Sequence, residues 1–189
     1  MCFNSCIPLL MLIDLQKAID DPSWGIRNNP NAEFQIGKLL SLWRERSFPI
    51  LHIKHMSTDL NSKYLPGTPG NQFKDIAMPI ELEEILEKDT NSAFIGTNLH
   101  TMLQERGITE LVLIGVITNN SVEATARMAG NLGYKVIVVS DATFTFNQTD
   151  FGGKEHEAEV VHNMSLANMN GEYATILSTK EVINFANNL

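Results

Sequence analysis

The chain has 189 residues, of which 43% are hydrophobic and 19% are charged, and its formal net charge is −8. This length and composition predict one globular domain, spanning residues 1–189, that is large enough to bury a single sizeable core. The acidic balance, with no basic patch, argues against nucleic acid or a membrane surface as the main partner.

The N-terminal region contains one apolar stretch that could be mistaken for a targeting or membrane segment. This stretch, Ile7–Leu12, is too short for a membrane span, lacks a basic flank and is soon followed by Asp14. The two cysteines, Cys2 and Cys6, lie at the extreme N-terminus and could not cross-link a fold of this size. We therefore expect a cytoplasmic protein with reduced thiols.

Six short apolar runs predict β-strands. They are continuous rather than alternating, which is typical of strands buried on both faces of a parallel sheet. In chain order they are Leu9–Asp14, Pro49–Ile53, Glu84–Lys88, Glu110–Val116, Lys135–Ser140 and Tyr173–Leu177.

Helical patterns alternate with these runs. The first has Ile36, Leu39, Leu40 and Trp43 on one face and a basic end at Arg44 and Arg46. The others are Thr97–Arg106, Ser121–Leu132, Glu155–Met169 and a final helix to Asn188 that Thr179 can cap. The alternation predicts an α/β fold: a three-layer α-β-α arrangement around a doubly wound, six-stranded parallel sheet of Rossmann type.

Two loops, Asp20–Pro30 and Met56–Pro79, are rich in proline, glycine and asparagine, and the second is unusually long. Long loops in compact domains usually serve as lids, binding loops or oligomer arms. A tolerated insertion without function is the alternative for the second loop. The long loop and the small-residue helix ATARMAG together predict a homo-oligomer.

Three polar residues are placed at the carboxyl ends of predicted strands, where open parallel sheets bind ligands. Asp14 ends the first strand, Lys88 ends the third, and Ser121 follows the fourth and opens the next helix. We expect the three to converge in one cleft. Each has a structural alternative: Ser121 as a helix N-cap, Lys88 as a solvated strand end, and Asp14 as a buried carboxylate that needs Lys88 as its partner.

These residues lie in three motifs: LLMLIDLQ, KDTNSAFIGTNL and GVITNNSVEATARMAGNLGY. With them the sequence resembles the isochorismatase-like cysteine hydrolases over essentially the whole chain. The resemblance implies a small-molecule hydrolase that cleaves a C–N amide bond through a covalent acyl-enzyme. It also implies a catalytic triad in which Asp14 takes the proton of the nucleophile, Lys88 stabilises the charge, and the family's cysteine position falls on Ser121.

A serine hydroxyl is several pKa units more basic than a thiol, and the sequence near Ser121 shows no Ser–His pairing. Three interpretations of Ser121 stay open: an engineered substitution that traps substrate, a natural non-catalytic member that retains binding, or a slow serine variant. The intact motif around Ser121 favours the first. A non-catalytic binding protein is the rival function, and a flavodoxin-like nucleotide-binding module is disfavoured because no phosphate loop is present.

The resemblance further implies an oxyanion hole made by the backbone N–H groups of Ile117 and Ser121, with a cis peptide bond between Val116 and Ile117. The helix that begins at Ser121 would add its dipole to the same field.

The predicted substrate-binding residues are Trp24, His55, Phe94 and Asn120; the two aromatic side chains have a core or interface role as the alternative. We expect no metal, because alternation along the strand places His52 and His55 on opposite faces and the Asp-x-His spacing of metal-binding amidases is absent. No dinucleotide fingerprint or Walker A motif occurs, so we expect no nucleotide cofactor.

Overall fold

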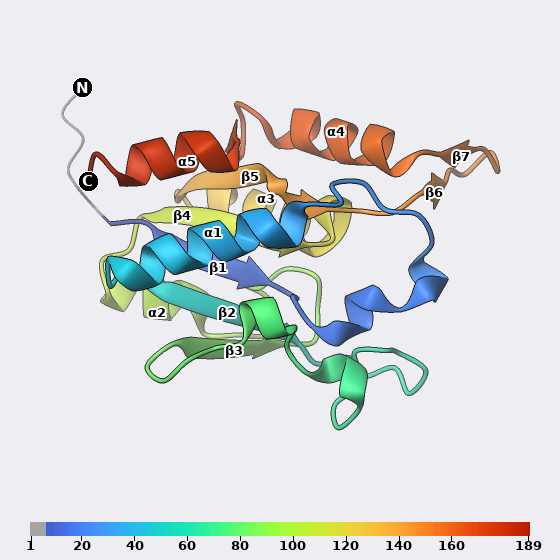
Figure 1. Cartoon of the computed structure of the whole chain (residues 1–189), viewed down its shortest axis with the longest axis horizontal. Coiled ribbons are helices and arrows are strands. Elements are labelled where there is room, and N and C mark those ends of the chain that lie inside the picture. The colour runs from blue at the N-terminus through green and yellow to red at the C-terminus, as the bar shows by residue number, and fades with distance from the viewer. Residues whose placement is uncertain (1–6) are drawn as a thin grey trace.

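The computed structural model describes residues 7–189, so Cys2 and Cys6, on which the expectation of reduced thiols rests, lie outside the described residues. A six-stranded sheet in the order β3-β2-β1-β4-β5-β8 forms the middle layer, and every neighbouring pair is parallel (Figure 1). The strands are β1 (Leu9–Ile13), β2 (Ile50–His55), β3 (Glu84–Lys88), β4 (Glu110–Val116), β5 (Lys135–Phe144) and β8 (Thr175–Leu177). The chain winds outward from the centre in both directions, which confirms the predicted doubly wound sheet.

Helices cover both faces of the sheet. One face carries α1 (Ala32–Glu45) and α5 (Thr179–Ala186), and the other carries α2 (Leu99–Glu105), α3 (Glu123–Asn131) and α4 (Ala158–Met169). In β1, Leu10 and Leu12 belong to the core beneath α1 and α5, whereas Met11 and Ile13 belong to the core on the other side. Both faces are thus buried, which explains the continuous apolar runs. Within the described chain, none of the helices is long and apolar enough to cross a membrane.

The predicted start of α4 was wrong. Residues Glu155–His156 form strand β7, which pairs antiparallel with β6 (Gln148–Thr149), and α4 begins only at Ala158. His156 Nε2 lies 2.7 Å from Asp150 Oδ2, which helps to close this hairpin. Local strand pairing therefore replaces the first helical turn that the sequence pattern suggested.

The predicted cap of α5 was also displaced by one residue. Ser178 is the N-cap, and its hydroxyl and the side chain of Glu181 form a reciprocal capping box. The hydroxyl and backbone N–H of Thr179 instead donate to Asp141 Oδ1, at 2.8 and 2.7 Å. Thr179 thus connects the start of α5 to β5.

The small residues of α3 pack on this chain's own sheet. Ala126 and Ala129 are fully buried in the core shared with α2 and α4, and a side chain at Gly130 would meet the backbone of Tyr173. The ATARMAG helix therefore has an internal use, and it no longer supports the predicted homo-oligomer.

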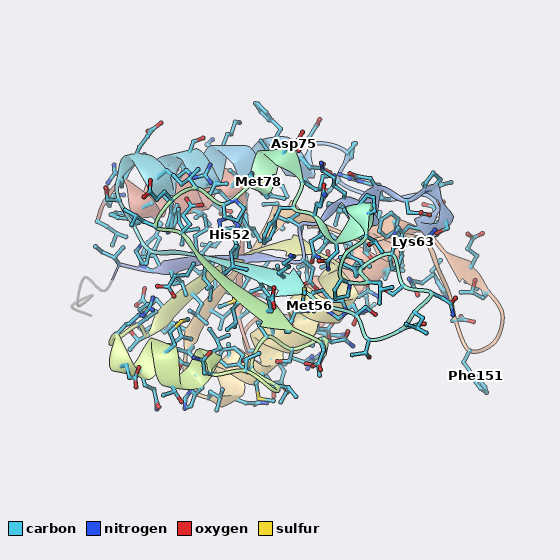
Figure 2. The ribbon with its side chains drawn as sticks, turned by 90° about the horizontal axis from the view of Figure 1, so that it is seen from below. His52, Met56, Lys63, Asp75, Met78 and Phe151 are labelled. Atoms are coloured by element: carbon cyan, nitrogen blue, oxygen red, sulfur yellow. The ribbon has the colours of Figure 1, made fainter. Side chains whose placement is uncertain are left out.

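The loop from Met56 to Pro79 folds back over the carboxyl edge of the sheet and then runs beside α1 (Figure 2). Phe73 bridges to Gln16, and the backbone N–H of Lys74 donates to Leu15 O at 2.9 Å. Short helical turns lie in this loop and in the preceding one, at Lys17–Asp20, Pro22–Trp24, Pro69–Asn71 and Asp75–Ala77. The Met56–Pro79 loop is thus held next to the residues that follow β1.

Gly115 allows β4 to pass close to β1 just below the site. Its φ is +115°, and a Cβ there would lie 2.2 Å from Ile13 O. Gly115→Ala is therefore expected to lower the free energy of unfolding by about 3 kcal/mol or more, as measured by urea unfolding. Gly133→Ala is the matched control, because its φ is +90° but nothing lies within 4 Å of the added Cβ. The control should lose only about 1 kcal/mol, and equal losses would contradict the steric explanation.

Candidate active site

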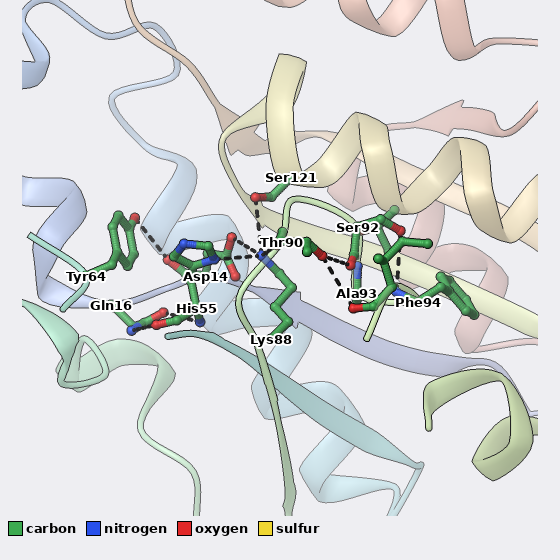
Figure 3. A network of polar contacts seen from close by, with 12 residues as sticks. Asp14, Gln16, His55, Tyr64, Lys88, Thr90, Ser92, Ala93, Phe94 and Ser121 are labelled. Carbon is green, nitrogen blue, oxygen red and sulfur yellow. Dashed lines mark hydrogen bonds and ion pairs between the residues drawn. The ribbon is translucent and has the colours of Figure 1, made fainter. Parts of the chain in front are cut away.

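Asp14, Lys88 and Ser121 converge at the carboxyl edge of the sheet, as their positions after parallel strands predict. Lys88 Nζ lies 2.7 Å from Asp14 Oδ2 and 3.4 Å from Ser121 Oγ (Figure 3). Asp14 directly follows β1, Lys88 is the last residue of β3, and Ser121 lies in a π-helical turn, Thr118–Val122, after β4. All three are buried.

Every N–H group of the Lys88 ammonium has a hydrogen-bond acceptor nearby. Besides Asp14 and Ser121, it contacts the carbonyl oxygen of Thr90 at 3.0 Å and His55 Nδ1 at 3.3 Å. Lysine has only N–H donors, so Nδ1 of His55 acts as the acceptor. Burial, followed by the charge of Lys88, lowers the pKa of His55. His55 is therefore neutral at physiological pH.

The carboxylate of Asp14 is suited to accept a proton. Burial raises its pKa, and the nearby ammonium group of Lys88 opposes this effect. Its Oδ2 accepts from Lys88, whereas Oδ1 is buried and has no hydrogen-bond partner within the described residues. A carboxylate with a raised pKa is a stronger base, and its free oxygen is available to a neighbouring O–H or S–H group.

Ser121 is not the helix cap that its position suggested. Between β4 and α3 the chain makes a π-helical turn, and within the described residues the Ser121 hydroxyl makes no capping bond to α3. Its hydroxyl instead faces Lys88 Nζ, at 3.4 Å, and the carboxylate of Asp14. The turn is held from α4, where the Ser165 hydroxyl donates to Glu123 Oε2 at 2.6 Å and lies 3.4 Å from the carbonyl oxygen of Thr118. His162 Nδ1 lies 2.9 Å from the Thr118 hydroxyl.

A cavity of about 160 Å³ opens above these residues. Its lining consists of Asp14, Trp24, His55, Ser62, Tyr64, Asn91, Val116, Ile117, Asn120 and Ser121. The peptide bond between Val116 and Ile117 is cis, as the family resemblance implied. Ile117 and Ser121 thus share one cavity, although their role as oxyanion donors stays a prediction.

Of the predicted substrate-binding residues, the structure brings Trp24, His55 and Asn120 to the cavity but not Phe94. The Phe94 ring points away from Lys88 (Figure 3) and packs 5.8 Å from the ring of Tyr134, at the edge of the core. The cause is local: the backbone N–H of Ala93 donates to the Thr125 hydroxyl of α3, which turns this segment inward. Phe94 therefore has the core role that was its alternative.

Sequence reasoning missed the loop residues of the site, above all Tyr64. Its hydroxyl lies 3.5 Å from the carbonyl oxygen of Asp14, and its ring packs edge-on against His55 at 5.5 Å. Ser62 comes from the same loop and Asn91 from the segment after β3. The signal available was the length of the Met56–Pro79 loop, which indicated a function but no particular residue.

Two buried amides hold this loop on the site. Gln16 pairs with the backbone of His55, accepting from its N–H at 2.7 Å and donating to its carbonyl at 2.9 Å. Asn71 donates to the carbonyls of His55 and Tyr64, both at 2.8 Å. In the sequence, the feature that could have indicated this connection is the glutamine two residues after Asp14. The structure shows that Gln16 is fully buried, and a buried amide needs hydrogen-bond partners.

The two histidines of β2 lie in different environments. His52 is buried, contacts Glu83 at 2.9 Å and packs against Phe73, whereas His55 faces the cavity. Among residues 7–189, no group of three or more His, Cys, Asp or Glu side chains is arranged to hold a metal ion.

Comparison with known proteins agrees with this geometry. Residues 8–181 match the isochorismatase domain. The chain is 43% identical to the isochorismatase family protein YrdC of Bacillus subtilis (strain 168), over 93% of this chain and 94% of that protein. It is 30% identical to Nicotinamidase 3 of Arabidopsis thaliana, over 84% of this chain and 81% of that protein.

A solved structure shows the same architecture. The crystal structure of an isochorismatase-family protein from Chromobacterium violaceum ATCC 12472 superimposes with a TM-score of 0.96 and 49% identity, covering 100% of this chain and 98% of that one. The family match thus covers residues 8–181, and the structural match covers 100% of this chain. The chain belongs to the isochorismatase family of hydrolases.

Proposed function

We propose that the fold and site are those of an amide hydrolase that cleaves the C–N bond of a small molecule through an acyl-enzyme. The observation that supports this most is the arrangement of Ser121 and Asp14 around Lys88. Asp14 Oδ1 is buried beside the cavity and has no hydrogen-bond partner among residues 7–189. The relative named Nicotinamidase 3 carries the name of an amide-cleaving enzyme, which agrees with the proposal.

In the proposed mechanism, a nucleophile at position 121 attacks the amide carbonyl carbon and transfers its proton to Asp14. The oxyanion accepts hydrogen bonds from the backbone N–H groups of Ile117 and residue 121. The C–N bond then breaks, and the leaving nitrogen takes the proton from Asp14 and departs as ammonia or an amine. Water, deprotonated by Asp14, then attacks the acyl carbonyl carbon, the bond between this carbon and residue 121 breaks to release the acid, and Asp14 returns its proton to residue 121. Lys88 keeps Asp14 ionised between these transfers.

This sequence differs from the family resemblance at the nucleophile, because Ser121 stands at the family's cysteine position. A thiol near a cation and a helix N-terminus reaches the thiolate at neutral pH, whereas a serine hydroxyl does not. With serine at position 121, the protein should therefore bind its substrate but hydrolyse it very slowly. An engineered Ser121 accounts for the intact surroundings; a natural binding protein on the same fold is the second candidate, because Ser121 leaves the cavity in place.

Ser121→Cys tests the proposal. Ammonia release from a panel of small primary amides should rise by on the order of 100-fold or more over the Ser121 protein, because only the thiol gives an accessible nucleophile. Ser121→Ala is the matched control and should show no activity. If Ser121→Cys stays inert while the Ser121 protein binds a panel member tightly, the binding-protein function replaces the hydrolase.

A homo-oligomer, a small-molecule partner with neither nucleic acid nor membrane, and a cytoplasmic location stay predictions.

A further inference from the structure

The charges at the cavity are already compensated within the protein. Among the described residues that line it there is one carboxylate, Asp14, and no lysine or arginine. Lys88 is the nearby cation, but its side chain is 0% exposed, and its three N–H groups face four acceptors. It therefore has no donor left for an anionic ligand.

The approach to the cavity is balanced as well. A neighbouring hollow shares Ser62 with the cavity and is lined by Lys17 and Lys63 together with Asp20 and Asp21. Lys63 pairs with Asp21 at 3.0 Å, and Lys17 pairs with Asp75 at 3.4 Å. Each lysine of this hollow thus has a carboxylate partner, and its two lysines are matched by two aspartates, so the approach carries no excess positive charge.

The other polar groups that line the cavity are neutral. Ser62, Asn91 and Asn120 offer hydroxyl and amide groups, and burial raises the pKa of Tyr64 well above its usual value, so its hydroxyl stays protonated. Trp24, stacked on Phe146 at 5.6 Å, supplies an apolar wall. Such a set matches the N–H and C=O groups of an amide without requiring a charge.

The volume of the cavity also limits the size of the ligand. This volume of about 160 Å³ is below the roughly 300–1,000 Å³ of pockets that hold drug-sized ligands. A molecule of a few carbon atoms, or a single ring with one amide, fits this range better than a larger compound.

We infer that the site selects small uncharged amides and rejects amides that carry a carboxylate; this inference rests on the proposed amide hydrolysis. A ligand carboxylate would place a second negative charge near the buried Asp14, with no free cation to compensate it. Rejection thus arises from an unpaired charge rather than from shape.

Isosteric pairs test the selection with little change in size. Succinamide and succinamate, and terephthalamide and 4-carbamoylbenzoate, differ in that one amide is replaced by a carboxylate. With the Ser121→Cys protein, kcat/KM from ammonia release should be at least tenfold higher for each diamide, beyond the factor of two for its second amide. Binding of the same pairs to the Ser121 protein, measured by calorimetry, should show the same order.

A charge variant provides the internal control. Asn91→Lys adds a cation at the cavity and should lower the ratio of diamide to acid-amide kcat/KM at least threefold. Asn184→Lys on the exposed surface of α5 makes the same change in net charge away from the site and should leave the ratio unchanged. Equal responses of the two variants would contradict selection by local charge.

The outcomes separate the inference from the proposed function. If Ser121→Cys hydrolyses the acid-amides as well as or better than the diamides, the inference is wrong and the hydrolase stands. If no amide is hydrolysed but the Ser121 protein binds diamides over acid-amides, the hydrolase is wrong and the selection stands. If neither turnover nor binding occurs, both are wrong.

Discussion

Asp14→Asn in the Ser121→Cys protein is expected to lower amide turnover by roughly 10²–10⁴-fold. The amide of asparagine keeps the shape of the carboxylate and an oxygen for Lys88, but it has no basic oxygen to take the thiol proton. Asp14 is the only carboxylate among the described residues that line the cavity. The neutral His55 already accepts from Lys88 through Nδ1, so it is not placed to take the thiol proton instead. Steady-state ammonia release gives the ratio.

A second readout separates proton transfer from structural damage. The rate of iodoacetamide alkylation of the thiol at position 121, followed against pH, reports thiolate formation. In the Asp14→Asn protein the alkylation profile should move to lower pH, because Lys88 remains as a counter-charge while the neighbouring carboxylate is gone. Lost turnover with a readily alkylated thiol then identifies the missing proton acceptor rather than a damaged site. Calorimetric binding of a diamide by Asp14→Asn with Ser121 intact should change little. Turnover within tenfold of the Asp14 enzyme would show that another base is used.

Lys88→Met is expected to have the other large effect, because it lowers both the free energy of unfolding and the amide turnover. Asp14 and Lys88 are 5% and 3% exposed. Removing one partner of a buried ion pair costs about 3–5 kcal/mol, because the remaining charge is uncompensated. Urea unfolding at neutral pH should show a loss in this range, and turnover in the Ser121→Cys background should be lost.

The double variant Asp14→Asn/Lys88→Met should recover most of the lost stability but none of the activity, because both charges are gone. Burial already raises the pKa of Asp14, and without Lys88 it rises further. A carboxyl whose pKa is raised on folding favours the folded state at low pH, and this contribution is lost as pH rises through the folded pKa. The deficit of Lys88→Met should therefore shrink as pH is lowered from 7 towards 5. Simple additivity of the two single losses would contradict a coupled pair.

Parts of the sheet were predictable to the residue. The bounds of β3 and β4, Glu84–Lys88 and Glu110–Val116, are those expected from the apolar runs. The extension of β5 to Phe144 was not, because Ser140 and Asp141 interrupt the apolar pattern and the pairing with β4 shifts register between Leu113 and Gly115. A register shift depends on the neighbouring strand, which the local sequence does not contain.

Some residues of the site could likewise be predicted from the sequence, and others could not. Parallel topology alone places Asp14, Lys88 and Ser121 at one edge, so their convergence followed from strand order. The contact of Gln16 with His55 joins residues 39 positions apart through a loop, and no periodic pattern encodes it. Phe94 was misplaced for a related reason, because the direction of a loop side chain is set by hydrogen bonds to another element.

In the proposed hydrolysis, the acyl group of the substrate is attached to residue 121. The most direct test is peptide-level mass spectrometry of Ser121→Cys protein quenched during turnover of succinamide. The peptide containing residue 121 should gain the mass of the substrate minus ammonia, and Asp14→Asn in the same background should give no such adduct. Turnover with an adduct on another residue, or turnover with no adduct in rapid-quench samples, would contradict this proposal.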